Sequence, residues 1–306
     1  MVDSLTLPQW RAAKQRHEER VGPFANERLA RTGRKHPVYD FLFEYYSYRA
    51  GHLLRWSPGI DVYLEGATSA DHPWPQLFEF DERGAILVGR TFPVHRREQL
   101  DWAIFYHTAI RDREPQFNCF GLHEWAMVYQ TAAVRHSRVP LRLSSEQTDS
   151  QVSAAGVRCT HFDAQRFFTP SALPLNKWEL TRSNSPEHDQ PGCVHVNMDL
   201  YKFSFKFAPF TSSELLADAF ELAVVARELD MRASPYDLRS HGFEPIRIET
   251  RDGREEYVRR QREVAELAEP VRVRLRAEYR RVRQLTAETS VREQCEEAIS
   301  SPECRP

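Results

Sequence analysis

Three short runs between Cys119 and Asp199 carry side chains that can do chemistry. They are Cys119 to Glu124, Cys159 to Asp163, and Cys193 to Asp199, and each sets a thiol, an imidazole and an acidic side chain close together. Cysteine, histidine and carboxylate groups ligate zinc or iron, and they also carry nucleophilic and acid–base catalysis. Three such runs in one stretch predict that the functional site is built here.

Metal-assisted chemistry is the first hypothesis for these runs. Structural zinc sites repeat closely spaced cysteine pairs or Cys2His2 spacing, and this chain has neither. A catalytic metal instead takes a few ligands from separated elements and leaves one position open. Mixed imidazole and carboxylate ligands favour zinc or non-haem iron as the cofactor. The candidate metal ligands are His123, His161, His195 and Asp163, and the candidate catalytic groups are Glu124, Asp163, Asp199 and Cys159.

Two other hypotheses use the same residues. Cys159 with His161 and Asp163 has the residue types of an activated thiol. We expect the partners of a catalytic thiol to come from different runs. In the third hypothesis the runs belong to the core of a non-enzymatic binding protein, with the cysteines buried as small hydrophobic residues.

The elements that would position a substrate are aromatic and basic. A helix predicted from His36 to about Trp56 is rich in rings, which could pack in the core or line a pocket. In the second interpretation its rings hold a planar substrate, and basic side chains hold an anionic group. The candidate substrate-binding residues are Tyr45, Tyr48, Arg49, Trp125, Arg166 and Lys202.

Composition narrows the class of protein and partner. The chain has 306 residues, 41% hydrophobic and 28% charged, with a formal net charge of −2. This balance is typical of a globular protein, and it does not favour duplex DNA over a small-molecule or nucleobase-type substrate. The five cysteines form no disulfide framework, and no run resembles a signal peptide or a membrane span. We therefore expect a cytoplasmic protein with reduced thiols and no membrane partner.

The expected fold is mainly α with a small β component (α+β), as a single large domain. A charged helical arm is predicted over 1–35, interrupted near Gly22. One catalytic domain is predicted over 36–288, with its Cys/His/Asp core at 117–207, followed by a flexible tail over 289–306.

Finer predictions follow from periodicity and turn residues. Helices are predicted at 96–113, 117–129, 211–231 and 254–287, the last broken at Pro270. Short strands are predicted at 61–65, 78–80, 85–88 and 245–249. Residues 144–151 are predicted to be a loop, and 200–207 to be a strand or a helix.

Longer blocks resemble a family of actinobacterial proteins commonly labelled 3-methyladenine DNA glycosylase. The resemblance spans roughly residues 35–258 and rests on five blocks. The first is His36-Pro37 with Asp40 to Phe43 and Tyr45 to Ser47, and the second is Cys119 to Tyr129. The others are Arg158 to Asp163 with Arg166 to Pro170, Gln190 to His195 with Asn197 to Lys202, and Glu228 to Leu238.

The resemblance implies a hydrolase that flips an alkylated base into an aromatic pocket and activates water with a carboxylate, without a metal. Tyr45, Tyr48 and Trp125 would stack the base, and Asp163 or Asp199 would act as the general base. A free nucleobase, a nucleoside or another small molecule suits the composition better than duplex DNA.

Overall fold

The computed structural model describes residues 3–31, 35–132 and 138–300, with residues 288–300 described by their backbone alone. It confirms the predicted class, because the protein is mainly helical and carries one small four-stranded sheet. None of the described helices is long and apolar enough to cross a membrane.

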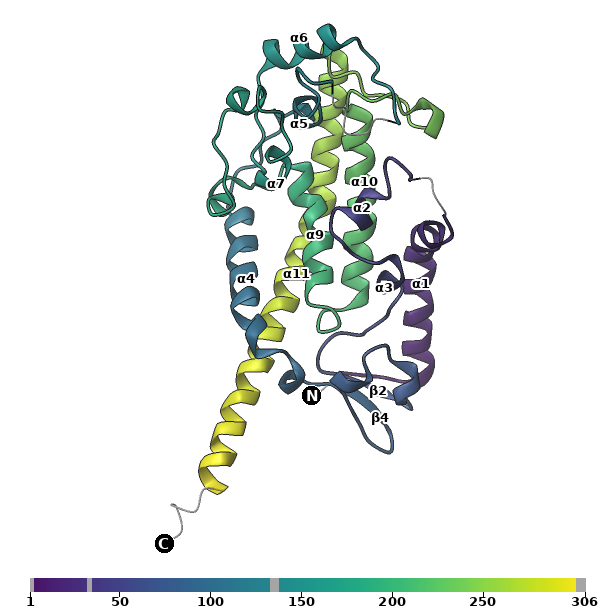
Figure 1. Cartoon of the computed structure of the whole chain (residues 1–306). Helices are drawn as coiled ribbons and strands as arrows, with labels where there is room; N and C mark the ends of the chain where they lie inside the picture. Colours follow the sequence, from purple (N-terminus) through teal and green to yellow (C-terminus); the bar gives the residue numbers. More distant parts are fainter. Residues whose placement is uncertain (1–2, 32–34, 133–137, 301–306) are drawn as a thin grey trace.

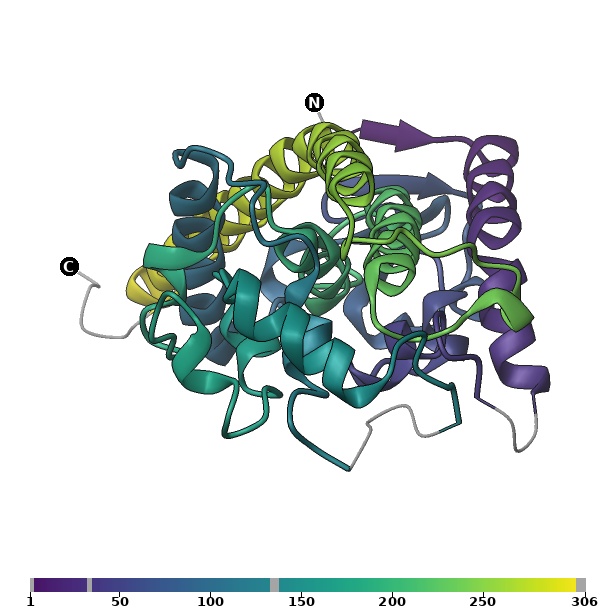
Figure 2. The ribbon, with the colours of Figure 1, turned by 90° about the horizontal axis from the view of Figure 1, so that it is seen from above.

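Three central helices form the body of the protein (Figure 1). They are α9 (Val194–Lys206), α10 (Ser213–Ala233) and α11 (Arg251–Ser300). Helix α4 (Arg97–Arg111) packs on α11, and α1 (Leu7–Ala30) packs on α10 from the other side. Viewed from above, α4 and α1 flank the central helices (Figure 2).

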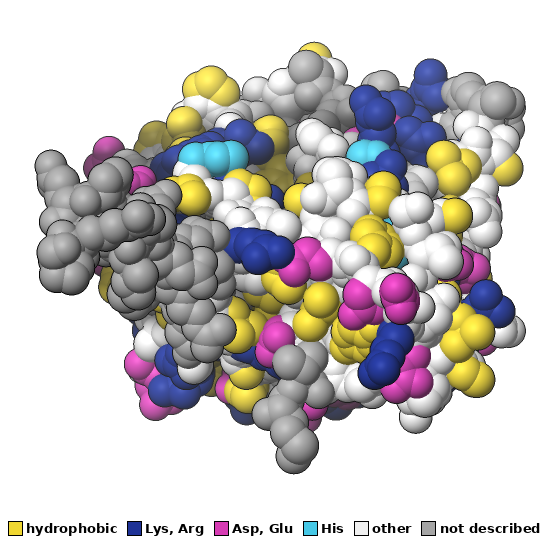
Figure 3. Space-filling model, turned by 90° about the horizontal axis from the view of Figure 1, so that it is seen from below, with side chains coloured by type: hydrophobic (Ala, Val, Ile, Leu, Met, Phe, Trp, Pro, Cys, Tyr) yellow, Lys and Arg dark blue, Asp and Glu magenta, His cyan; other side chains and the backbone are white. Residues whose placement is uncertain are grey.

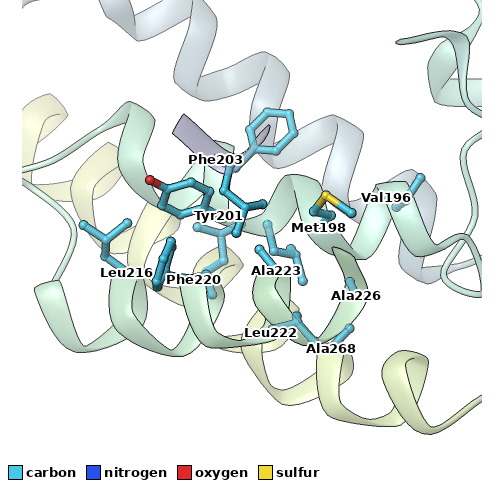
Figure 4. Packing of buried hydrophobic residues seen from close by; sticks show 14 of the residues in the cluster. Val196, Met198, Tyr201, Phe203, Leu216, Phe220, Leu222, Ala223, Ala226 and Ala268 are labelled. Carbon is cyan, nitrogen blue, oxygen red and sulfur yellow. The ribbon is translucent and has the colours of Figure 1, made fainter. Parts of the chain in front are cut away.

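The hydrophobic core lies between the central helices. Apolar side chains recur at helical spacing along α9 and α10, so each helix presents one apolar stripe to the other. Figure 4 shows Met198 and Tyr201 of α9 packed against residues of α10 and α11. The rings of Tyr201 and Phe220 meet edge to face, with centroids 5.2 Å apart.

The sheet lies at the lower end of the body in Figure 1. Its order is β1-β2-β4-β3, with β1 (Asp3–Leu5), β2 (Val62–Glu65), β3 (Phe78–Phe80) and β4 (Gly84–Leu87). Strand β1 pairs with β2 in parallel, and the other two pairings are antiparallel. The structure therefore confirms the three strands predicted near residues 61–88 and adds β1.

Short helices and long connections cover the upper ends of the central helices (Figure 1). They include α5 (Leu122–Ala126), α6 (Ser145–Ala155), α7 (Phe162–Gln165) and α8 (Ser185–His188). Further helical turns are α2 (Phe41–Glu44), α3 (Ala50–Leu53) and 3-10 turns at Ser69–Asp71, Pro75–Leu77, Gly89–Thr91, Val94–Arg96, Leu173–Leu175 and Arg239–His241.

Several predicted elements are wrong in ways that local chemistry explains. The helix predicted from His36 to Trp56 is split into α2 and α3, because Ser47 has a φ of 56° in the left-handed region. The loop predicted at 144–151 belongs to α6, whose N-cap Ser144 accepts the Gln147 amide in a capping box. Residues 245–249 form no strand, because Ile246 donates to the Arg232 carbonyl at the end of α10 instead.

Two prolines do not break the helices that contain them. Helix α1 runs through Gly22-Pro23 and buries a stripe that includes Trp10, Val21 and Ala25. Helix α11 runs through Pro270, whose ring lies on the exposed face. Packing along these helices outweighs the one lost hydrogen bond at each proline.

The ends of the predicted domains fall partly outside the described residues. Backbone helix continues to Ser300, within the tail predicted over 289–306, whereas 301–306 lie outside the described residues. Residues 1–2 and 32–34 of the predicted arm also lie outside them.

Residues 200–207, predicted as strand or helix, fall mostly in α9.

Substitution of Phe220 by alanine should destabilise the protein strongly. The side chain is fully buried (0% exposed) between the central helices, so its loss removes apolar contacts and leaves a cavity. We expect the free energy of unfolding to fall by about 3–5 kcal/mol in a urea titration. Val225→Ala, at a 43% exposed position on the same helix, serves as the control and should change stability by less than about 0.5 kcal/mol.

Candidate functional site

The three runs meet at the upper ends of the central helices. His123 lies in α5, His161 is the N-cap residue of α7, and His195 lies in the first turn of α9. The His123 and His195 ring centroids are 4.4 Å apart, and those of His161 and His195 are 5.5 Å apart. All three imidazoles are buried, so the runs form one continuous polar centre inside the protein.

His123 belongs to a buried network of charges. Its Nε2 lies 2.6 Å from Asp230 Oδ1, and Arg227 Nη1 donates to Asp230 Oδ2 at 2.7 Å and to Glu124 Oε1 at 3.1 Å. The Arg227 guanidinium also lies 4.0 Å from the centroid of the Phe41 ring. The cations of Arg227 and protonated His123 therefore neutralise the carboxylates of Asp230 and Glu124, which offsets the cost of removing these charges from water.

The network sets the protonation of its histidines. Burial opposes the charged imidazole, but Asp230 outweighs it and raises the pKa of His123 to about 10. Burial and the nearby charge of His123 lower the pKa of His195 well below its ordinary value. His195 is therefore the neutral member of the pair.

His161 is held by a second carboxylate. Its Nδ1 lies 2.9 Å from Asp189 Oδ1, and Tyr106 Oη donates to Asp189 Oδ2 at 2.6 Å. This contact directs Nε2 toward Asp199, 3.9 Å from Oδ2. Burial lowers the pKa of His161, but Asp189 raises it by more, so the pKa lies above its ordinary value.

Lys202 joins the two remaining aspartates of the centre. Its Nζ donates to Asp199 Oδ2 at 2.9 Å and to Asp163 Oδ2 at 3.4 Å. Tyr46 Oη donates to the other oxygen of Asp199 at 2.8 Å. Burial acts to raise the pKa of Asp199, but Lys202 and His161 lower it, so the carboxylate is ionised.

A cleft of about 680 Å³ opens beside His161, between α4, α7, α8 and α9. Its wall includes the ring of Trp102, which is 43% exposed and stacks on Tyr106 with centroids 4.9 Å apart. Cations and hydroxyl groups also face the cleft. The lining residues that bear on chemistry are His161, Asp163, Asp189, Asp199, Lys202, Lys206, Arg182, Ser183 and Ser185.

Two much smaller cavities lie on either side of His195. One, of about 10 Å³, is lined by the thiols of all three runs together with His123 and His195. The other, of about 20 Å³, is lined by rings such as Phe41 and Tyr45 and by Glu124 and Arg227. Each has room for about one water molecule.

Two sets of side chains within the described residues bring possible metal-binding atoms within 4.8 Å of one another. The first is His123, His195 and Asp230, and the second is His161, Asp163 and Asp199. The first set is fully buried, whereas all three members of the second line the cleft. Only the second set is therefore positioned to act on a substrate.

The remaining predicted site residues are scattered around the centre. Cys159 is buried, its Sγ lies 3.5 Å from the His161 carbonyl oxygen, and burial raises the pKa of its thiol, so the thiol is protonated. Trp125 is fully buried (0% exposed) and donates from Nε1 to the Ala233 carbonyl, so its ring faces no cavity described above. Arg49 is exposed and lies outside the cleft lining.

The aromatic residues expected to hold a substrate also pack elsewhere. Tyr48 Oη donates to the Lys202 carbonyl, and its ring stacks on Phe205 with centroids 4.0 Å apart. Tyr45 lines the 20 Å³ cavity, and the guanidinium of Arg166 lies 5.9 Å from the Tyr45 ring centroid. Of the predicted substrate-binding residues, Lys202 is the one that lines the cleft.

Sequence reasoning missed Asp189, Arg227 and Asp230. Asp189 lies four residues before Cys193, just outside the third run. Arg227 and Asp230 are three residues apart on α10, and their spacing is typical of an ordinary exposed helical ion pair. The sequence does carry a signal for Arg227 and Asp230, because both lie within the apolar stripe of α10, where unpaired charges are not expected.

Comparisons of the chain with known protein families, with curated proteins and with solved structures found no match. The chemistry of the site is therefore inferred from its own geometry.

Substitution of Arg227 by methionine should destabilise the protein severely. Methionine fills similar space but removes the guanidinium that donates to Glu124 Oε1 and to Asp230 Oδ2, so these buried carboxylates lose a cation. We expect the free energy of unfolding to fall by about 3–5 kcal/mol in urea. Arg20→Met is the matched control: Arg20 pairs with Asp218 and Glu221 but is 32% exposed, so its loss should cost no more than about 1 kcal/mol. Equal losses in both variants would contradict this account.

Proposed function

We propose that the protein is a metal-dependent hydrolase that acts on a small planar anion, with its active site in the cleft beside His161. The metal would be a zinc or iron ion held by His161, Asp163 and Asp199. The observation that carries this proposal is the convergence of these three side chains within 4.8 Å on the wall of a 680 Å³ cleft.

Asp189 supports this assignment. A histidine that ligates a metal usually donates its other ring N–H to a carboxylate, which fixes the ring. Asp189 accepts from His161 Nδ1, leaving Nε2 free toward Asp199. Two atoms that share a metal at about 2.1 Å lie about 3–4 Å apart, and the Nε2 to Oδ2 distance is 3.9 Å.

The buried set is a weaker choice for the metal. His123 already uses Nε2 for Asp230 and also interacts with Cys119, so no lone pair is left for a ligand bond. The oxygens of Asp230 are taken by His123 and Arg227. In the proposed hydrolase, His123, His195 and Glu124 therefore neither bind the metal nor transfer protons to the substrate.

A metal in the cleft would supply water that is nucleophilic at neutral pH. The residues of the cleft would position the substrate against it. A flat ring would stack on Trp102, and Lys206 and Arg182 would bind an anionic group. Lys202, displaced from Asp163 and Asp199 by the metal, would join them.

A nucleobase or nucleoside derivative is the substrate class that fits these walls. The cleft volume suits a drug-sized or nucleoside-sized molecule. Duplex DNA is less favoured, because the formal net charge of the chain is −2. On the lower face, shown in Figure 3, the described acidic and basic side chains are interspersed. We also propose a cytoplasmic location, consistent with the free thiols of Cys119, Cys159 and Cys193.

A second candidate function is hydrolysis of a glycosidic bond without a metal, as the 3-methyladenine DNA glycosylase label would imply. The observation that favours it is the ammonium group of Lys202, which already neutralises Asp163 and Asp199. His161, oriented by Asp189, would then act as the general base. Metal content decides between the two candidates.

Elemental analysis of protein purified without a histidine tag should find about one equivalent of zinc or iron. His161→Asn and Asp199→Asn should lose it while circular dichroism shows an intact fold, because each removes a ligand. His195→Asn is the matched control, being an equally buried histidine outside the proposed set, and should retain the metal. Loss of the metal in His195→Asn alone would assign the metal to the buried set of His123, His195 and Asp230. A metal-free protein, even after anaerobic reconstitution, would leave the metal-free candidate.

Lys202→Met should bind the metal more tightly while hydrolysis becomes slower. Removing the ammonium group leaves Asp163 and Asp199 without their cation, so the dissociation constant for zinc should fall by about tenfold or more. The substrate meanwhile loses a cationic contact. Lys206→Met is the control, since Lys206 lines the same cleft one turn further along α9, and it should raise KM without changing metal affinity. Unchanged zinc affinity in Lys202→Met would contradict the assigned position of the metal.

A further inference from the structure

The thiols of the three runs face a cavity separate from the cleft. Cys119, Cys159 and Cys193 all line the 10 Å³ cavity beside His123. Cys159 and Cys193 are buried, whereas Cys119 is partly exposed. Cys119 is therefore the most exposed of the three residues.

Hydrogen-bond donors converge on the Cys119 sulfur. Gln261 Nε2 lies 3.6 Å from Sγ, and the same amide group donates to the Gly192 carbonyl at 2.6 Å, which fixes its position. The backbone N–H of Gly121 and the imidazole of His123 also interact with the sulfur. Donors of this kind stabilise a thiolate over a thiol.

The backbone after Cys119 is shaped to bring these donors together. Phe120 and Gly121 are both left-handed, with φ of 51° and 70°. At Gly121 a side chain would also meet Ala233, since an added Cβ would lie 3.2 Å from its Cβ. A non-glycine residue in this region is strained by about 1 kcal/mol, and such strain concentrates at functional sites.

Asp230 completes a relay of the Cys–His–Asp type. It lies 2.6 Å from His123 Nε2, which leaves the other ring nitrogen for Cys119. Burial raises the pKa of a thiol, but His123 and the Gly121 N–H outweigh it and hold the pKa of Cys119 below its ordinary value. Burial instead raises the pKa of Cys159 and Cys193.

A buried hydroxyl group lies beside this sulfur. The hydroxyl of Tyr257 is fully buried and interacts with the Cys119 thiol, and no oxygen or nitrogen atom pairs with it within the described part of the chain. Sulfur is a weak hydrogen-bond acceptor, so this buried hydroxyl is poorly satisfied. It is placed to donate to an oxygen atom added at the sulfur.

Titratable and charged groups face the relay from every element packed around it. They are His123 and Glu124 on α5, Arg158 and Cys159 before α7, Asp189 before α9, Cys193 and His195 at the start of α9, Arg227 and Asp230 on α10, and Tyr257 on α11.

We propose that Cys119 is a peroxide-reactive nucleophile, which His123 and Asp230 position and which hydrogen peroxide converts to a sulfenic acid. The thiolate attacks one peroxide oxygen, so an S–O bond forms as the O–O bond breaks. Sulfur loses two electrons and the peroxide gains them. The departing hydroxide takes the proton of the His123 imidazolium and leaves as water. The cavity admits a molecule of about the size of water, which suits peroxide rather than a larger electrophile.

The test treats the full-length, EDTA-washed protein with hydrogen peroxide and then unfolds it in dimedone, which tags sulfenic acids for mass spectrometry. We expect the tag on Cys119 at least tenfold faster than on Cys159 or Cys193. Between pH 6.5 and 8.5 the rate should rise by less than the roughly fiftyfold gain of an ordinary thiol with a pKa near 8.5, because the pKa of Cys119 lies below its ordinary value. Because metal is removed, the result does not depend on the proposed hydrolase.

His123→Asn should lower the rate at pH 6.5 at least tenfold and restore the pH dependence of an ordinary thiol, and Asp230→Asn should act in the same direction. Cys159→Ser and Cys193→Ser are matched controls and should leave tagging of Cys119 unchanged. If the network variants do not fold, the pH profile of the wild-type protein decides. Equal tagging of the three thiols, or a wild-type rate that rises tenfold per pH unit, would overturn the proposal.

Discussion

The rest of the site depends on the buried ion pairs that Arg227 makes with Asp230 and Glu124. Arg227 donates to Glu124 of the short helix α5, and Asp230 contacts His123 of the same helix, so these charges fasten α5 to the long helix α10. The same guanidinium is covered by the Phe41 ring, so α2 is tied to the same point. Without Arg227, His123 would be the one cation left to compensate the two buried carboxylates of Glu124 and Asp230, which would destabilise the fold strongly.

His195 lies between the thiols beside His123 and the carboxylates beside His161. On one side it faces His123 and the thiols, and on the other its ring is stacked parallel to His161 beside the cleft. Because it is neutral, it lies between the two charged networks without adding to either. The proposed thiolate and the proposed cation site can therefore lie within one polar centre while each keeps its own carboxylates, Asp230 for the first and Asp163 with Asp199 for the second.

Much of the fold follows from local sequence, whereas the site only partly does. Helix α10 is predicted by its cap and apolar repeat, and β2 to β4 by their short apolar runs and a turn. The runs around His123, His161 and His195 identify where the chemistry lies, but not which partners they use. The residue types around Cys159 favoured it as the reactive thiol. The proposal instead gives that role to Cys119, which precedes a left-handed turn and whose histidine lies one helical turn away. Asp230 is 107 residues from His123, and no local pattern joins them.

That separation also orders the events of folding. Helices α9 and α10 are joined by a short turn, so their packing closes a small loop, whereas the contact of His123 with Asp230 closes one of 107 residues. Loops close at an entropic cost that grows with length, and contacts between distant segments form after local ones. The helical body can therefore assemble before α5 docks on it. Until that docking occurs, the chain has a core but neither a relay for its thiol nor a completed polar centre.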